Sequence, residues 1–401
     1  MKLLIVSQHF WPEKFRINDI CKGLSKKNHE IYVLTGIPNY PSGILNQKYK
    51  EDHTKFKEYY NCKIIRVPIL LRGKSKFSLF LNYLSFPIIA STYGLFKIWK
   101  IKFNSILIFQ TSPIFQALPG ILLSKLKGIK SAMIVLDLWP EAIKGTKYNF
   151  LYSLIDLFSN FVYKNLSLIL CQSRAFQRSI QNKIQEPEKV IFFPSWSDDK
   201  SSDNKSLQNL PNSYEQYSQF KILSTGAIGE PQDMESVIML ATELKKENVS
   251  AKIFMVGNGT QYELTRNLIK KNQLEAHIEL LGEYELEMMA AFFDQADFAF
   301  ISLRNQLAYN MTIPARMQSY TFHGKPILGM ANGEVNEMIN TNNLGYCAES
   351  GDYKELTKVI KKIISLKVRD NSYSLNSKRY YEENFQRDRL LSKLENFLEE
   401  I

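Results

Sequence analysis

Short apolar runs alternate with amphipathic stretches along the whole chain. In the first half the runs cover residues 2–7, 31–36, 63–68, 105–109, 131–137 and 166–171. In the second half they cover residues 220–226, 251–259, 278–282, 296–303, 326–330 and 345–349. Apolar strands that alternate with helical segments form parallel sheets covered by helices on both faces. The pattern therefore predicts an α/β protein with a doubly wound, Rossmann-like domain in each half.

A polar stretch separates the two halves. Residues 198–218 contain almost no large aliphatic side chains, which is typical of a linker or an exposed loop. A chain of 401 residues is also too long for one ordinary domain and suits two. We predict an N-terminal domain, a linker, a C-terminal domain and a C-terminal helix, over residues 1–198, 199–218, 219–375 and 376–401. The domains would face a central cleft, because ligands of such sheets bind beyond the carboxyl ends of the strands.

One apolar stretch without charged residues runs from Phe77 to Phe96. It has the length of about 20 residues that a membrane-spanning helix needs, but several polar residues dilute it. Three interpretations stay open: a membrane span, a pair of buried core helices, or a surface helix whose aromatic side chains lie among lipid headgroups. In the third case the flanking lysines would contact anionic lipid. They are Lys74, Lys76, Lys97, Lys100 and Lys102.

The net charge of +11 is unevenly placed. Residues 1–200 hold 29 Lys and Arg against 13 Asp and Glu, whereas residues 201–401 hold 22 against 27. This asymmetry indicates that the N-terminal domain faces an anionic partner. The sequence has no aromatic–basic nucleic-acid motif and no Cys/His finger. We therefore expect an anionic membrane surface as partner, and no nucleic acid.

The cysteines and histidines bear on compartment and metal binding. The four cysteines have no paired spacing, so they predict neither a disulfide framework nor a zinc site, and they fit a reducing compartment. The first ten residues contain too short an apolar run for a signal peptide, so we expect a cytoplasmic protein. The five histidines form no metal-ligand pattern, and no cofactor or catalytic metal is expected.

A candidate phosphate site lies in the C-terminal half, where Pro314 opens a predicted helix after the strand at 296–303. Proline suits the first turn of a helix, and a helix N-terminus offers free amides and a positive dipole end to an anion. Arg316 adds a planar fork that matches phosphate oxygens. An ordinary αβ unit with a surface arginine is the alternative interpretation.

Three loops of the N-terminal half also follow predicted strands. His9, Phe10 and Trp11 follow the first strand, and Asn39 and Tyr40 follow the second. Aromatic faces of this kind can hold sugars or a lipid tail, although both loops can also be rigid turns. The third loop begins at Asp137, at the end of the strand at 131–137. Its carboxylate can accept a proton from an acceptor hydroxyl or cap a helix.

These segments resemble retaining nucleotide-sugar glycosyltransferases of family 4, which have the GT-B fold. The similarity is strongest to the branch that transfers N-acetyl-L-fucosamine in bacterial surface polysaccharides. It covers nearly the whole chain and rests on SQHFWPEKFRIND, LTGIPNYPSG, TSP, LDLWPEA, VGNG and TIPARMQSY. The resemblance implies a UDP-sugar donor, a polyprenyl-diphosphate-linked acceptor and transfer with retention. It also implies a role in O-antigen or capsule biosynthesis at the inner face of the cell membrane.

The loops and the resemblance together give a set of candidate site residues. Asp137 and Arg316 would be catalytic. The donor would be bound by Arg16, Gly226, Gly257, Asn258, Tyr284, Thr312, Ile313, Pro314, Gln318, Ser319 and Glu337. The acceptor would be bound by His9, Phe10, Trp11, Asn39, Tyr40, Ser112 and Trp139. Glu141 is the alternative to Asp137.

The sequence departs from the family pattern in two places. The loop at 227–232 lacks the usual cation, and the paired glutamates of the family correspond to Met311 and Ser319. Glu337, or Glu334 in its place, would then bind the ribose, and Arg16 and Arg304 would help Arg316 with the diphosphate. Two other functions remain open: a UDP-sugar 2-epimerase, or a non-catalytic nucleotide-sugar-binding partner in a polysaccharide assembly complex.

Overall fold

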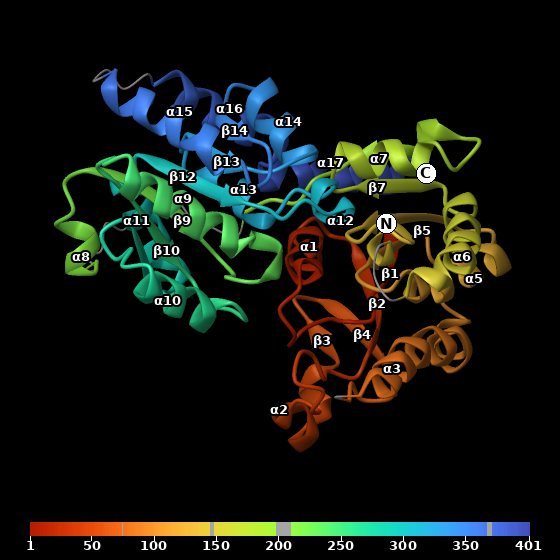
Figure 1. The fold of residues 1–401 in the computed structure, drawn as a ribbon. Coiled ribbons are helices and arrows are strands. Elements are labelled where there is room, and N and C mark those ends of the chain that lie inside the picture. The colour runs from red at the N-terminus through yellow and green to blue at the C-terminus, as the bar shows by residue number, and fades with distance from the viewer. Residues whose placement is uncertain (74, 145–147, 198–209, 367–370) are drawn as a thin grey trace. The chain divides into compact units, whose positions relative to one another are not determined.

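The apolar runs form two separate sheets. The computed structural model describes residues 1–401 apart from 74, 145–147, 198–209 and 367–370. Unit 1 consists of Met1–Phe193 and Asp388–Ile401, and unit 2 of Pro194–Arg387 (Figure 1). Each unit has one mostly or wholly parallel sheet with helices, which confirms the predicted α/β fold class with two domains.

The sheet of unit 1 has eight strands in the order β3–β4–β2–β1–β5–β6–β7–β8. The strands are β1 (Lys2–Val6), β2 (Glu30–Gly36), β3 (Glu58–Tyr59), β4 (Cys62–Val67), β5 (Ser105–Gln110), β6 (Lys130–Val135), β7 (Leu168–Cys171) and β8 (Val190–Phe192). All neighbours are parallel except β3, which runs antiparallel to β4. The two short strands β3 and β8 were not predicted, because runs of two and three residues carry little periodicity.

The centre of this sheet is a topological switch point. In β1, Leu3 pairs with Ile31 of β2 on one side and with Ser105 of β5 on the other. The chain first winds outward through β2 and β4, and then restarts at β5 on the other side of β1. Loops that leave such a point in opposite directions open a crevice at the carboxyl ends of the strands. The loops after β1 and β5 therefore flank the expected ligand position of unit 1.

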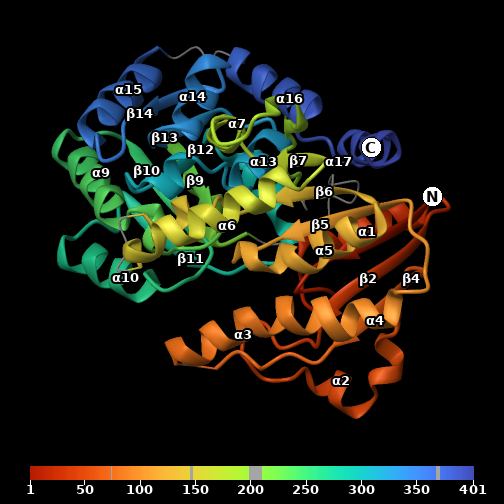
Figure 2. The same ribbon diagram turned by 90° about the vertical axis from the view of Figure 1, so that its right-hand side faces the viewer.

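Helices cover both faces of this sheet. They are α1 (Arg16–Ser25), α2 (Gln47–Glu51), α3 (Lys76–Ile89), α4 (Leu95–Ile98), α5 (Leu118–Lys127), α6 (Tyr152–Lys164), α7 (Arg174–Gln181) and α17 (Arg387–Glu400). A π-helical turn, η2 (Ala90–Gly94), joins α3 to α4. Figure 2 shows α3, α4, α5 and α6 arranged on one side of the sheet.

Among the described residues, one helical stretch is long and apolar enough to cross a membrane. It covers Ser78–Ile98 and has a mean hydropathy of 1.3. Here it lies along the sheet, and 39% of it is buried. Phe86 and Ala90 are fully buried on the inner face, whereas Ile88 and Phe96 are exposed on the outer one. The core-helix and surface-helix interpretations therefore describe two faces of one segment.

The C-terminal segment divides between the units. Residues 376–401 were predicted as one helix, but α16 (Ser372–Asn384) belongs to unit 2 and α17 to unit 1. Leu390, Leu394 and Leu398 bury one face of α17. Glu395 of α17 pairs with Lys27 and with His29 just before β2, at 2.5 Å and 2.7 Å. The buried leucine face and these polar contacts together hold the last helix on the first domain.

The sheet of unit 2 is entirely parallel, in the order β11–β10–β9–β12–β13–β14. Its strands are β9 (Phe220–Thr225), β10 (Ala251–Val256), β11 (Ile278–Gly282), β12 (Phe298–Ser302), β13 (Ile327–Met330) and β14 (Gly345–Ala348). This is the doubly wound order, with its switch point between β9 and β12. A cluster that includes Leu240, Ile253, Phe300 and Leu356 forms the core.

The helices of unit 2 complete the fold. They are α8 (Asn212–Glu215), α9 (Met234–Lys246), α10 (Tyr262–Lys271), α11 (Met289–Gln295), α12 (Leu307–Asn310), α13 (Ala315–Phe322), α14 (Glu334–Thr341), α15 (Tyr353–Ser365) and α16. The predicted linker is shorter than expected, since Leu210 and Tyr214 are buried. Tyr214 donates to the carbonyl of Phe292 at 2.5 Å. Residues 199–209 of that linker lie outside the described part of the chain.

Candidate functional site

Three loops of unit 2 meet at the carboxyl ends of β9, β10 and β11. The amide of Gly226 donates to Val256, and that of Gly257 to Gly282, at 2.9 Å and 2.7 Å. Gly226 and Gly257 have φ angles of +101° and +143°. A Cβ atom on Gly257 would lie 2.0 Å from the carbonyl oxygen of Gly226, so no side chain fits there. The two glycines bring bare backbone to the edge where ligands of such sheets bind.

Arg316 lies against the first of these loops. Its Nη2 donates to the carbonyl of Ala227 at 2.9 Å, and its Nη1 lies 3.5 Å from Oγ of Ser224. The residue stands in the first turn of α13, whose N-cap, Pro314, makes no side-chain hydrogen bond to the helix. Among the described residues, no carboxylate pairs with Arg316. A half-buried guanidinium and a helix N-terminus thus lie together at the switch point of unit 2.

Arg304 is less available than predicted. Its guanidinium lies 4.0 Å from the carboxylate of Glu230 and 3.8 Å from that of Asp233. Its amide donates to the carbonyl of Pro231. The loop at 227–232 contains no cation of its own, but Arg304 from the loop after β12 lies against it. The positive charge of Arg304 is partly neutralised there by Glu230 and Asp233.

Several predicted donor-binding residues serve the fold. Ile313 is buried, and Thr312 donates its hydroxyl to the carbonyl of Ala308 at 2.7 Å. Gln318 is buried too, and with its amide nitrogen facing inward it donates to the carbonyls of Pro314 and Ala315. The side chains of Ile313 and Gln318 are thus buried against the protein, and their roles in donor binding stay predictions.

The remaining donor candidates keep some exposed surface. Asn258 is exposed, although its Oδ1 accepts from the amide of Gly259 at 2.8 Å. The ring of Tyr284 packs edge-on against Phe292, with centroids 5.0 Å apart. Ser319 is half-buried on α13. These three stay predictions.

Two glutamates occupy the first turn of α14. Glu334 is buried, whereas Glu337 is exposed. The preceding Gly333 has a φ of +66°, and a Cβ atom there would lie 2.2 Å from the carbonyl oxygen of Asn310. The loop after β13 therefore runs directly against the segment that leads into α13. Both carboxylates stay candidates for a ribose contact.

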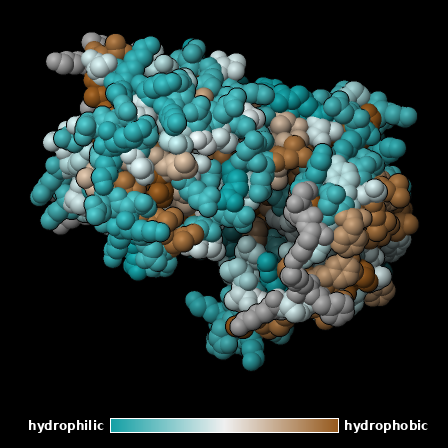
Figure 3. All heavy atoms as spheres, in the orientation of Figure 1, coloured by the Kyte–Doolittle hydropathy of each residue, from teal (hydrophilic) through white to brown (hydrophobic). Residues whose placement is uncertain are grey.

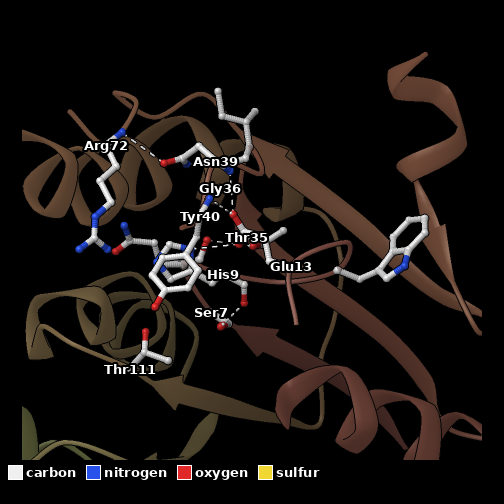
Figure 4. Close-up of polar contacts among 12 residues, drawn as sticks. Ser7, His9, Glu13, Thr35, Gly36, Asn39, Tyr40, Arg72 and Thr111 are labelled. Carbon is white, nitrogen blue, oxygen red and sulfur yellow. Dashed lines mark hydrogen bonds and ion pairs between the residues drawn. The ribbon is translucent and has the colours of Figure 1, made fainter. Parts of the chain in front are cut away.

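In unit 1, one carboxylate joins the loops after β1 and β2. Oε1 of Glu13 accepts from the amides of Asn39 and Tyr40, at 2.7 Å and 2.6 Å. Its Oε2 lies 3.0 Å from Nδ1 of His9 (Figure 4). Sequence reasoning missed Glu13; the available signal was its spacing of four residues from His9. Arg66 was also missed: it donates to the carbonyls of Gly36 and Trp11, and burial lowers its pKa to about 10.

Three of the predicted acceptor-binding residues pack against neighbouring parts of the protein. Phe10 is fully buried and packs edge-on against Tyr59, 5.6 Å away. The Trp11 ring lies against Phe56 and Tyr59, at 4.8 Å and 5.3 Å. Asn39 is buried, with its side chain bonded to neighbouring backbone. Phe10 thus packs inside the loop, whereas Asn39 also lines a cavity beside Tyr40. As acceptor contacts, both stay predictions.

His9 and Tyr40 do lie together at the carboxyl edge. Their ring centroids are 5.1 Å apart, and Tyr40 is 42% exposed. The guanidinium of Arg72 lies 5.4 Å from the Tyr40 ring centroid (Figure 4). A cavity of about 300 Å³ opens beside Tyr40 and is lined by Glu13, Asn39 and residues between 42 and 47. Its size suits one monosaccharide.

Asp137 follows β6 and is exposed in part, but protein atoms desolvate its carboxyl group. This desolvation raises the pKa of Asp137, and a hydrogen bond from the Ser112 hydroxyl opposes the rise. Glu141 differs: its Oε1 accepts from Lys183 at 2.6 Å and from Ser179 at 3.0 Å. Because Glu141 is buried and ion-paired, Asp137 is the better candidate for a reacting carboxylate.

Two further predicted residues, Arg16 and Trp139, lie in unit 1. Arg16 begins α1 in unit 1, and is thus not part of the unit that carries Arg316 and the glycine loops. Trp139 is half-buried, and its carbonyl accepts from the Tyr163 hydroxyl at 3.3 Å. Four loops of unit 1 contain a cis proline, after Trp11, Tyr40, Ser112 and Trp139.

Residues 209–380, most of unit 2, match the family model described as glycosyl transferases group 1. The protein named "Putative colanic acid biosynthesis glycosyl transferase WcaI" of Escherichia coli K12 is 26% identical over 279 residues. That alignment covers 65% of this chain and 67% of the relative.

Solved structures agree on the fold. Anabaena HepE in complex with UDP superposes with a TM-score of 0.71 over 100% of both chains, at 13% identity. WaaG, a glycosyltransferase of lipopolysaccharide biosynthesis, gives 0.63 over 99% of both chains, at 15% identity. These likenesses establish the fold, and together with the family match they support a GT-B glycosyltransferase.

Proposed function

We propose that this protein transfers a sugar from a UDP-sugar to a polyprenyl-diphosphate-linked acceptor, with retention, during synthesis of a bacterial surface polysaccharide such as O-antigen or capsule. The observation that carries the proposal is the position of Arg316, without a carboxylate partner among the described residues, against the glycine loop after β9. HepE, whose crystals contain UDP, and WcaI, named for colanic acid biosynthesis, support this donor class and product class. The FWPE and TGIPNYP segments make N-acetyl-L-fucosamine the first sugar to test.

The proposed role of Arg316 follows from the negative charge that develops on the leaving group. When the glycosidic bond of a UDP-sugar breaks, negative charge gathers on the departing diphosphate. The guanidinium of Arg316 and the free amides of α13 stabilise that charge in place and need little reorganisation. No metal is expected to be required for this step. On unit 1, Asp137 would accept a hydrogen bond from the attacking hydroxyl and orient it.

A thermal-shift screen over nucleotides tests the donor class. UDP and UDP-sugars should raise the melting temperature, because a ligand at 100 times its Kd stabilises the folded state by about 2.7 kcal/mol. GDP- and dTDP-sugars at the same concentration are the controls. Equal shifts with every nucleotide would contradict the proposed donor. UDP release with and without acceptor then distinguishes a transferase from a 2-epimerase or a non-catalytic binding partner.

We also propose that unit 1 works at the inner face of the membrane through the layer formed by α3, α4, α5 and α6. Large apolar side chains on this layer are exposed: Phe80, Ile88, Tyr93, Phe96, Trp99, Leu126, Phe150, Leu154, Leu157 and Phe161. Figure 3 shows hydrophobic groups gathered over α5 and α6. A soluble surface rarely exposes so large an apolar area without a binding partner.

Charge makes an anionic membrane the fitting partner. Residues 59–136 contain eleven Lys and Arg and no Asp or Glu. Lys97 lies over the Tyr93 ring and Lys125 over the Phe161 ring, at 4.5 Å and 5.1 Å. Lysines beside exposed aromatic rings are typical of surfaces that insert among anionic headgroups. Lys74, which was predicted to join them, lies outside the described residues.

Vesicle binding by the full chain tests this surface. The triple change Phe96→Ser, Phe150→Ser and Leu157→Ser should weaken binding to phosphatidylglycerol vesicles by at least about tenfold, because full burial of even one such side chain contributes roughly 1.5–3 kcal/mol and about 1.4 kcal/mol is a factor of ten. The parent protein should also lose binding as salt increases. Leu264→Ser with Leu375→Ser changes exposed leucines of unit 2 and is the matched control. Equal losses in both variants would contradict a membrane-facing layer on unit 1.

A further inference from the structure

His9 and Glu13 form a buried imidazole–carboxylate pair at the carboxyl edge of unit 1. Their side chains are only 6% and 4% exposed, and Nδ1 lies 3.0 Å from Oε2. Because the carboxylate can only accept, Nδ1 must carry the hydrogen. In a neutral imidazole the lone pair is then on Nε2. The pair therefore fixes one tautomer of His9.

The orientation of the imidazole ring is fixed as well. It stacks on Phe15 with centroids 5.0 Å apart and planes within 6°, and it contacts Tyr40 on another side. Glu13 cannot move freely, because Oε1 also holds the amides of Asn39 and Tyr40. In the described part of the chain, Nε2 has no hydrogen-bonding partner. A preorganised acceptor atom thus stands at the switch point between β1 and β5.

We propose that Nε2 of His9 accepts a hydrogen bond from a hydroxyl group of the acceptor sugar, and that Glu13 is the positioning residue that keeps the imidazole able to do so. The inference rests on the proposed function, since it concerns the acceptor of that reaction. A sugar hydroxyl is the fitting ligand because it donates a hydrogen bond without charge, while the half-exposed ring of Tyr40 offers an apolar face beside it.

We assign to His9 a hydroxyl other than the one that reacts. His9 follows β1 and Asp137 follows β6, with β5 between the two strands. Neighbouring strands are roughly 4.8 Å apart, so the two side chains start about 10 Å from each other along the edge. In this proposal the acceptor lies across β1, β5 and β6. Asp137 faces the reacting hydroxyl, and His9 faces a second hydroxyl and so helps to determine which sugar is accepted.

The test measures acceptor kinetics with prenyl-diphosphate-linked monosaccharides and their monodeoxy analogues. His9→Phe keeps the ring and removes Nε2, so KM for the acceptor should rise roughly tenfold while KM for the UDP-sugar stays unchanged. The analogue that lacks the hydroxyl bound by His9 should raise the acceptor KM of the parent protein by the same factor. With His9→Phe, that analogue should raise KM no further. His53→Phe, an exposed histidine of the same unit, is the control.

A second variant guards against a merely structural effect. In Glu13→Gln the amide oxygen still accepts from Asn39 and Tyr40, but the amide nitrogen faces Nδ1 and forces the hydrogen onto Nε2. The ¹⁵N chemical shifts of His9 should report this change of tautomer, with acceptor KM raised severalfold and a near-normal melting temperature. An unchanged acceptor KM in His9→Phe would overturn the assignment. So would a His9→Phe variant whose acceptor KM rises further with every deoxy analogue. Transfer by the parent protein in the same assay reports separately on the proposed function.

Discussion

Replacing Arg316 by alanine should lower the rate of sugar transfer by roughly 100- to 1000-fold, the usual effect of removing one preorganised group that stabilises developing charge. The affinity for the UDP-sugar should fall less, by roughly 10- to 100-fold, since a hydrogen bond to a charged group contributes about 1.5–3 kcal/mol. The difference arises because the diphosphate carries more charge in the transition state than in the bound donor. Calorimetry with UDP beside the transfer rate measures both quantities.

Two further variants show whether the effect is specific to the guanidinium of Arg316: Arg316→Lys as a partial rescue and Arg266→Ala as a control. Lysine restores a point charge but not the fork that reaches both Ser224 and Ala227, so only part of the rate should return. Arg266 is half-exposed and paired with Glu263 on α10, and its removal should leave both quantities near their original values. An Arg316→Ala variant with unchanged affinity and rate would refute the donor site on α13.

The fold was predictable because its strongest signals are local. All twelve predicted apolar runs became strands, and Pro314 became the N-cap of α13. The sequence did not predict that the last helix, α17, belongs to the first domain. The leucines of α17 show which face is buried, but the contact of Glu395 with Lys27 and His29 joins residues more than 360 positions apart. No pattern in the sequence near residue 390 carries that information.

The site was predictable to the level of loops, and less so to the level of side chains. Sequence correctly directed attention to the loop after β1, but Phe10 turns inward because Tyr59, from a strand of two residues, packs against it. Glu13 binds amides of the loop after β2, a tertiary contact with no sequence periodicity. The same loops therefore contain both residues that fit a ligand and residues that hold the loops together.

Asp137→Asn should lower transfer by roughly 100- to 10,000-fold, the usual range for loss of a group that handles a proton, while donor affinity stays near normal. Desolvation raises the pKa of Asp137, so the carboxylate forms at a higher pH than an ordinary aspartate does. Transfer by the parent protein should accordingly decline on acidification earlier than an unperturbed aspartate would predict. The asparagine variant should lose that limb of the pH profile.

The melting temperature of the variants distinguishes a catalytic role of Asp137 from a purely structural one. A carboxyl whose pKa is higher in the folded protein than in the unfolded chain binds its proton more tightly when folded, so the free energy of unfolding falls as pH rises through the interval between the two pKa values. At neutral pH, Asp137→Asn removes this penalty and should leave the melting temperature equal or higher. Glu141→Gln provides the contrast, because it breaks a buried pair with Lys183 and should lower the melting temperature. If Asp137→Asn instead unfolds more easily and keeps its turnover, Asp137 supports the loop after β6, and the reacting hydroxyl must be oriented by another group.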